Sequence, residues 1–141
     1  MVNPTWWDEV DSYLYTYLNV KLKSALSSTY PKLYVTNSPK TDAAAMFPTV
    51  YIHTLESIEM GEDLDNTEIH AMLKSFQIDV LSNSTLADSK KVMREVVSLM
   101  KAKRFSIIGF PVYTAENNVY HGVCRFRRMI GSNDSEIVPQ Q

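Results

Sequence analysis

The feature that most constrains the fold is a long segment, residues 69–81, in which apolar and polar side chains alternate. Four large apolar side chains fall on even-numbered positions, whereas Gln77 and Asp79 lie between them on odd-numbered ones. Because successive side chains of a β-strand point to opposite faces of a sheet, the alternation predicts a strand with one buried and one solvated face. The buried face would hold Met72, Phe76, Ile78 and Val80.

Four other segments have the character of strands. Residues 47–55 form an apolar run that begins with Phe47-Pro48, and proline is tolerated at the start of a strand. Together with residues 69–81 this run predicts an extended hairpin. Residues 105–113 contain Gly109 and Pro111, which favour a bent or edge strand. The last two predicted strands are residues 119–130, after a turn at 114–118, and a short one at 33–35.

Two segments have helical periodicity. The first begins at Asn3-Pro4, because asparagine is a favoured N-cap and proline suits the first helical position, and it extends to about Ser28. The second runs to about Lys103, and it starts where Thr85 and Asp88 have the spacing of a capping box. Both segments therefore predict amphipathic helices that cover a sheet.

The order of these elements predicts an α+β domain. We expect a mostly antiparallel (mixed) β-sheet of four to five strands, with the two main helices packed on one face. A chain of 141 residues is long enough to bury its own core in one domain. That domain is expected to span residues 1–131, and the polar residues 132–141 are expected to form a flexible tail.

Composition excludes several classes of protein. No segment approaches the run of about 18 apolar residues that a membrane span requires. The first residues are acidic where a signal peptide would need a basic start. The single cysteine, Cys124, cannot form an internal disulfide, which fits a reducing compartment. We therefore expect a chain that is made in the cytoplasm and meets no membrane.

Residues that usually carry catalysis do not form a recognisable motif. His53, His70 and His121 are not spaced with one another or with Cys124 as metal ligands usually are. The chain has 4 glycines, too few to build either glycine-rich phosphate-binding motif. We therefore predict that the protein is not an enzyme and has no catalytic residue, no metal site and no cofactor.

Charge is distributed unevenly along a chain whose formal net charge is −2. Residues 1–85 carry 5 basic and 11 acidic side chains, whereas residues 86–131 carry 9 basic and 3 acidic ones. Unlike patches steer association, so such a chain can bind copies of itself head to tail. The alternative is two solvated faces of a monomer. Arg125, Arg127 and Arg128 would also suit a nucleic acid, although a pI of about 5.9 argues against that use.

A series of short motifs carries a resemblance to a known family. It begins at Phe47-Pro48-Thr49-Val50-Tyr51-Ile52, continues through Phe76-Gln77-Ile78-Asp79-Val80 and the helix after it, and ends with the arginine-rich segment 119–130. In the order and spacing of these motifs the chain resembles the tail terminator (tail completion) proteins of long-tailed bacteriophages. The resemblance covers roughly residues 5–131.

The resemblance implies a structural virion protein. Such proteins form a six-fold ring on the last ring of the tail tube, stop tube growth and dock to the head connector. The implied partners are further copies of this chain, the tail tube protein and the head-completion or connector protein, with genomic DNA only passing through the channel. The implied location is the head–tail interface of the virion, after assembly in the host cytoplasm. Two alternatives stay open: another head–tail neck or adaptor protein, and a small nucleic-acid-binding regulatory domain.

Candidate interface residues come from the charge distribution, because the family offers no catalytic motif to transfer. A closed ring needs heterologous contacts, in which one patch meets a different patch on the next copy. An acidic loop and a basic strand would provide two such patches. We expect the acidic residues at a subunit contact, the tube surface or the DNA channel, and the arginines against a neighbouring copy. The acidic residues are Glu59, Glu62, Asp63 and Asp65, and the arginines are Arg125 and Arg127.

Overall fold

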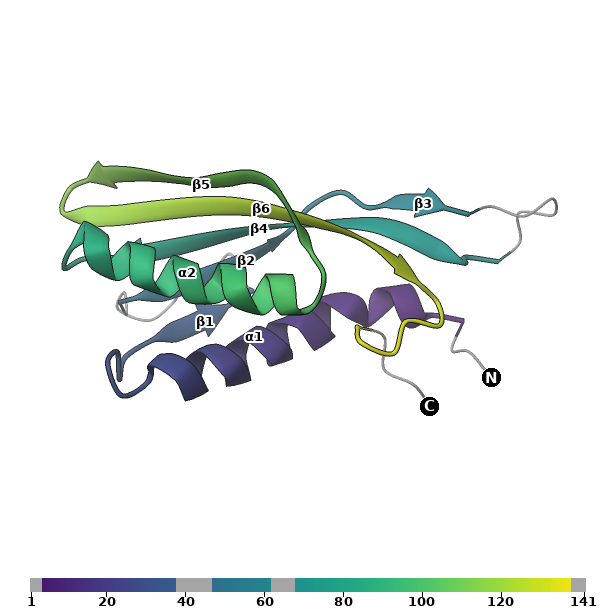
Figure 1. The fold of residues 1–141 in the computed structure, drawn as a ribbon, viewed down its shortest axis with the longest axis horizontal. Coiled ribbons are helices and arrows are strands. Elements are labelled where there is room, and N and C mark those ends of the chain that lie inside the picture. The colour runs from purple at the N-terminus through teal and green to yellow at the C-terminus, as the bar shows by residue number, and fades with distance from the viewer. Residues whose placement is uncertain (1–3, 38–46, 62–67, 138–141) are drawn as a thin grey trace.

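The computed structural model describes residues 4–37, 47–61 and 68–137, which fold around one β-sheet (Figure 1). Two long helices and a 3₁₀ turn accompany the strands. In chain order the elements are η1 (Trp6–Asp8), α1 (Val10–Leu26), β1 (Tyr34–Thr36), β2 (Thr49–Thr54), β3 (Ile58–Met60), β4 (Ala71–Ser82), α2 (Leu86–Ala102), β5 (Ser106–Glu116) and β6 (Val119–Gly131).

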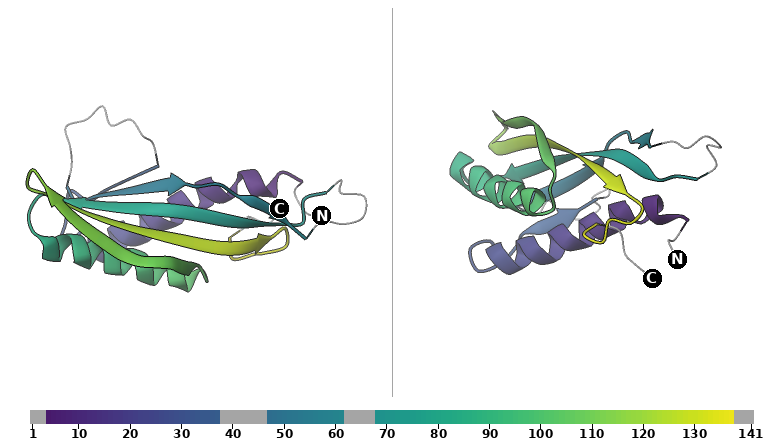
Figure 2. Two further views of the ribbon diagram at one scale, coloured as in Figure 1. Left: turned by 90° about the horizontal axis from the view of Figure 1, so that it is seen from above. Right: turned by 45° about the vertical axis from the view of Figure 1, so that its right-hand side comes forward.

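The sheet has the strand order β1-β2-β4-β6-β5, and β3 pairs with the part of β4 that β2 leaves free. Within the described residues β1 runs parallel to β2, and the other pairings are antiparallel. Both helices lie on one side of the sheet (Figures 1 and 2). The predicted α+β architecture is confirmed. The described sheet has six strands, not four to five, because β3 is too short to show alternation.

The first helix begins later than the sequence predicted. α1 starts at Val10, after the single turn of η1, and Asn3 lies outside the described residues. The cause is Trp6, which is buried and donates its indole N–H to the carbonyl oxygen of Ile69 at 3.1 Å. This tertiary contact outweighs the local preference of the chain for helix. Every fourth residue of α1 is then buried: Val10, Leu14, Leu18, Leu22 and Leu26.

The second helix follows its sequence signals. Thr85 Oγ1 accepts a hydrogen bond from the backbone N–H of Asp88 at 3.1 Å, which confirms the predicted N-cap. The helix ends at Ala102, and the N–H of Phe105 reaches back to the carbonyl oxygen of Met100 at 3.1 Å. Its buried stripe packs on β4 and β6 and consists of Val92, Met93, Val96 and Met100.

The core lies between the two helices and the face of β4 and β6 that points towards them. The buried face predicted for residues 69–81 is confirmed, since Met72, Phe76, Ile78 and Val80 are all buried. The rings of Phe76 and Phe105 meet edge to face, with centroids 5.8 Å apart. β6 adds Cys124, and burial raises the pKa of its thiol, so this cysteine acts as a small buried hydrophobe.

β5 and β6 form a hairpin with a tight turn. Asn117 and Asn118 both have positive φ, 52° and 65°, which is the geometry of a two-residue type I′ turn. The sequence predicted a longer turn, residues 114–118. The structure differs because Thr114 to Glu116 still pair with β6.

The segment after β6 is not the free tail that was predicted for residues 132–141. Ile137 is fully buried, and the carboxylate of Asp134 contacts Arg128 at 2.7 Å. Lys103 donates from Nζ to the carbonyl oxygen of Glu136 at 3.1 Å. Residues 132–137 therefore belong to the folded domain. The segment is mostly polar, but burial of Ile137 and the ion pair of Asp134 with Arg128 fix it against the domain. Residues 138–141 lie outside the described residues. Among the described residues, no helix is long and apolar enough to cross a membrane.

Candidate functional site

The helix-free side of the sheet, here called the open face, carries the polar side chains of the central strands. Gln77 on β4 lies opposite His53 of β2 on one side and Arg125 of β6 on the other. Residues directly opposite each other share a face of the sheet, so these three side chains stand together. Asp79 and Arg127 belong to the same face, because they lie two positions from Gln77 and from Arg125.

Asp79 is the centre of a hydrogen-bonded network on the open face. Its Oδ2 lies 3.2 Å from Nε2 of His53 and 3.0 Å from Nε2 of His121. Its Oδ1 accepts a hydrogen bond from Nε2 of Gln77 at 3.0 Å, and Gln77 Oε1 accepts one from Nε of Arg125 at 3.0 Å. The side chain of Asp79 is only 12% exposed, so these partners replace the water that its carboxylate loses.

The network holds its side chains in fixed positions on a polar surface. Both imidazoles contact the same carboxylate oxygen, and among the described residues no hydroxyl or thiol joins them. Tyr51 stacks on His53 with ring centroids 3.9 Å apart and thereby fixes the imidazole from one side. The described part of the chain has no group of three His, Cys, Asp or Glu residues that could hold a metal ion.

The structure places the predicted interface residues on different faces. Arg125 and Arg127 are both exposed on the open face, and Arg127 makes no hydrogen bond or ion pair with any described residue. Glu59 is also exposed, but it lies opposite Met72, whose side chain points towards the helices. Glu59 therefore lies on the other side of the sheet from the two arginines. The remaining three, Glu62, Asp63 and Asp65, lie outside the described residues.

Arg128 differs from the arginines beside it in the sequence. It is buried on the helix side of β6 and contacts Asp134 at 2.7 Å through its Nη2 atom. Its cross-strand partner, Lys74, is buried as well and contacts Asp11 of α1 at 2.8 Å. Each buried cation is matched by a carboxylate outside its own strand, Lys74 by Asp11 of α1 and Arg128 by Asp134 after β6, so both cations are paired within the described domain. Sequence spacing gave no signal of either pair.

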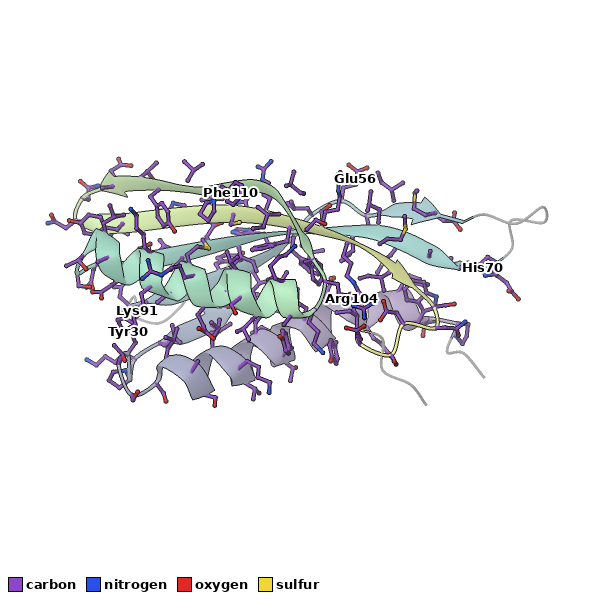
Figure 3. All side chains as sticks on the ribbon, in the orientation of Figure 1. Tyr30, Glu56, His70, Lys91, Arg104 and Phe110 are labelled. Carbon is purple, nitrogen blue, oxygen red and sulfur yellow. The ribbon has the colours of Figure 1, made fainter. Side chains whose placement is uncertain are left out.

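Apolar side chains are exposed along the edge of the sheet. β5 was predicted to be bent or at an edge, and it is both, because it pairs only with β6 and its register shifts twice. Three of its residues, here called the apolar edge, project from the sheet, and Figure 3 shows Phe110 pointing away from the helices. The exposed fractions are 48% for Ile108, 82% for Phe110 and 64% for Val112.

No protein-family model matches the chain, and no curated protein matches it. The fold and the site define the class on their own: an α+β domain that covers one side of its sheet with helices. The other side presents an ordered polar network, two exposed arginines and an apolar edge. Aromatic residues and arginine are enriched at protein interfaces, and this side of the sheet exposes both.

Proposed function

We propose that this chain is a structural virion protein that forms a ring on the end of a bacteriophage tail tube. The ring stops elongation of the tube and provides the docking surface for the head connector. The observation that carries the proposal is the one-sided sheet, whose open face has exposed charge while its edge has exposed apolar side chains. A ring protein needs such unlike surfaces, because each copy meets two neighbours through different patches.

The positions of the resembling motifs support this proposal. Thr49 to Ile52 lie on β2, Phe76 to Val80 on β4, and the arginine-rich segment on β6. These three strands are adjacent in the order β2-β4-β6, so motifs that are far apart in sequence form the continuous centre of one sheet. The resemblance to tail terminator proteins therefore concerns one structural unit.

The proposal includes partners and a place of action. The partners are further copies in a six-fold ring, the tail tube protein and the head-completion or connector protein, and genomic DNA only passes through the channel. The protein would act at the head–tail interface of the virion after assembly in the host cytoplasm. It would need no cofactor and no membrane. Another neck or adaptor protein of the same assembly is the nearest alternative, since such a ring would also need two unlike faces.

A nonsense codon in this gene of the phage that carries it tests the proposal. Electron microscopy of the lysate should show filled heads beside unattached tails of excessive and irregular length, because nothing stops the tube. Tails of normal length beside loose heads would assign the protein to the neck instead. Intact virions would refute both forms of the structural role.

Nucleic-acid binding is the second candidate function, and the observation in its favour is the exposure of Arg125 and Arg127 on an open sheet. The carboxylate of Asp79 at the centre of the open face and the net charge of −2 oppose it, because both repel phosphate. A nucleic-acid-binding domain would bind free DNA with an affinity that falls steeply as salt rises. We expect no such binding by the isolated protein, as measured by fluorescence anisotropy of labelled DNA across a salt series.

A further inference from the structure

The described sheet has edge strands on both sides: β5 on one side, and β1 and β3 on the other, and of these β5 and β3 are unlike. β5 pairs only with β6 on one side of the sheet, and β3 pairs only with β4 on the other. Each edge exposes apolar side chains, because Ile58 of β3 is 54% exposed and Phe110 of β5 is 82% exposed. Ile58 lies opposite Leu73 and therefore projects towards the open face, as the apolar edge does.

The apolar edge projects because β5 is bulged. Five residue steps separate Ile107 from Val112 on β5, whereas three separate their partners Phe126 and Val123 on β6. The two extra residues make β5 stand out from the sheet, and bulges of this kind aim side chains in new directions. Natural edge strands usually carry charges that discourage contact. This bulge instead presents an aromatic ring to solvent, which is typical of the core of a protein interface.

The two edges also carry opposite charges. Arg125 and Arg127 lie on β6, beside β5, and Arg127 has no partner among the described residues. Glu56 precedes β3, is exposed and makes no hydrogen bond or ion pair with any described residue. Figure 3 shows Glu56 and Phe110 on the side of the sheet away from the helices, and they belong to segments beside β3 and on β5. Within one copy these charges are unmatched, and between two copies they are complementary.

We propose that the apolar edge is the subunit contact of the ring and that it receives β3 of the next copy. Phe110 packs on Ile58 of the neighbour, and Arg127 pairs with the neighbour's Glu56. This contact rests on the proposed ring function and specifies its surfaces. Pro111 has no N–H and the bulge interrupts the regular row of backbone donors, so side chains rather than a continued β-ladder form the contact.

The contact is heterologous, which gives it a distinctive cross-linking pattern. Two single-cysteine substitutions, Ile58→Cys and Phe110→Cys, place thiols on the two sides of the contact, and the native Cys124 is buried. Under mild oxidation an equal mixture of the two variants should form disulfide-linked dimers, whereas each variant alone should remain uncross-linked. The double variant should give a ladder of linked species that ends at the closed ring. Cross-linking of Phe110→Cys with itself, or none in the mixture, would overturn the proposal.

Self-association of otherwise unmodified protein gives a second measurement. Phe110→Ser should weaken self-association by at least about tenfold in analytical ultracentrifugation, because removing a central interface aromatic commonly has that effect. The control is Val20→Ser, which alters another exposed apolar residue, 57% against 82% for Phe110, on the helix α1 instead of on β3 or β5. Equal weakening by both variants, or no effect of Phe110→Ser, would contradict the assigned contact.

Charge reversal tests the proposed ion pair between Arg127 and Glu56 of the neighbouring copy. Arg127→Glu should weaken association, and adding Glu56→Arg should restore it, because the pair is re-formed with opposite polarity. Failure of the second change to restore association would exclude the pairing.

If the nonsense phage makes overlong tails while no cross-link forms, the terminator function stands and the contact is wrong. If cross-links form while tails have normal length, the contact stands and the terminator function fails.

Discussion

Arg127 and Arg128 are neighbours in sequence with opposite environments, and they form a natural matched pair for a stability test. Arg128→Met leaves the carboxylate of Asp134, 16% exposed, without its partner, and loss of one member of a buried ion pair commonly costs about 3 kcal/mol. Arg127→Met alters an exposed side chain and should change the free energy of unfolding by less than about 0.5 kcal/mol. Urea unfolding checks both values, and equal effects would contradict the assigned burial.

Tyr30 has a distinctive titration. Burial, followed by the hydrogen bond that its hydroxyl donates to Asp88 at 2.7 Å, raises its pKa from 10.0 to about 12. Because the folded state holds this proton more tightly than the unfolded state, the stabilisation is complete below pH 10 and is lost as the pH rises towards 12. When the phenolate absorbance of the wild type is followed during a pH titration, Tyr30 should therefore ionise near pH 12. Tyr30→Phe should remove that step of the titration curve.

The hydrogen bond and the burial of Tyr30 can be separated. Asp88→Asn replaces the charged acceptor, so the pKa of Tyr30 should fall towards its ordinary value while staying above it, since burial is the larger cause. Ser84→Ala is the control, because it removes the other hydroxyl partner of the Asp88 carboxylate and keeps the Tyr30 contact. An unchanged pKa in Asp88→Asn would contradict the role of the hydrogen bond. Circular dichroism shows whether each variant stays folded during the titration.

At the scale of elements, local signals were predictable and tertiary ones were not. The start of α2 could be read from Thr85 and Asp88 because the hydrogen bond that defines it joins residues three apart. The start of α1 could not, because Trp6 is fixed by Ile69, 63 residues away in the sequence. β3 escaped prediction for a related reason: three residues carry no periodicity, and their pairing with β4 is decided by the register of the neighbouring strands.

The candidate site was also predictable only where its signals are local. The sequence indicated that Gln77 and Asp79 face away from the core, because alternation along one strand is a local property. It did not indicate that His53, His121 and Arg125 join them, since these come from two other strands and meet only in the final register. Of the three arginines that would suit a nucleic acid, Arg128 is turned inward by the period-two alternation of the strand.

The β5–β6 turn gives a prediction at this scale. Asn118 has φ 65°, a left-handed conformation that asparagine tolerates and alanine disfavours. Asn118→Ala should lower the free energy of unfolding by about 1 kcal/mol, whereas Asn118→Gly should leave it unchanged or raise it, because glycine suits this position of a type I′ turn. Thermal unfolding measures both. Asn133→Ala, at an exposed loop position, is the control, and an equal loss there would contradict the turn assignment.

At the scale of the whole molecule, the same sheet serves two purposes. Its helix side builds the core, and buried charges such as Arg128 and Lys74 are matched there by carboxylates from the two chain ends. Its open face keeps charges that the described part of the chain does not match, Arg127 among them. If the open face carries the proposed ring contact, stability and association are carried by alternate residues of the same strands. Substitutions of exposed open-face residues such as Arg127 should change the proposed assembly with little effect on folding.

The C-terminal segment belongs to the folding unit, and truncation tests this. A chain that ends at Gly131 loses the buried side chain of Ile137 and leaves Arg128 without Asp134. Together these losses should cost at least about 4 kcal/mol, a large part of the stability of an ordinary domain. A chain that ends at Ile137 keeps both contacts and should unfold at the same urea concentration as the full chain. If both truncated chains match the full chain, residues 132–137 contribute nothing to the fold, and the domain ends at residue 131 as the sequence alone predicted.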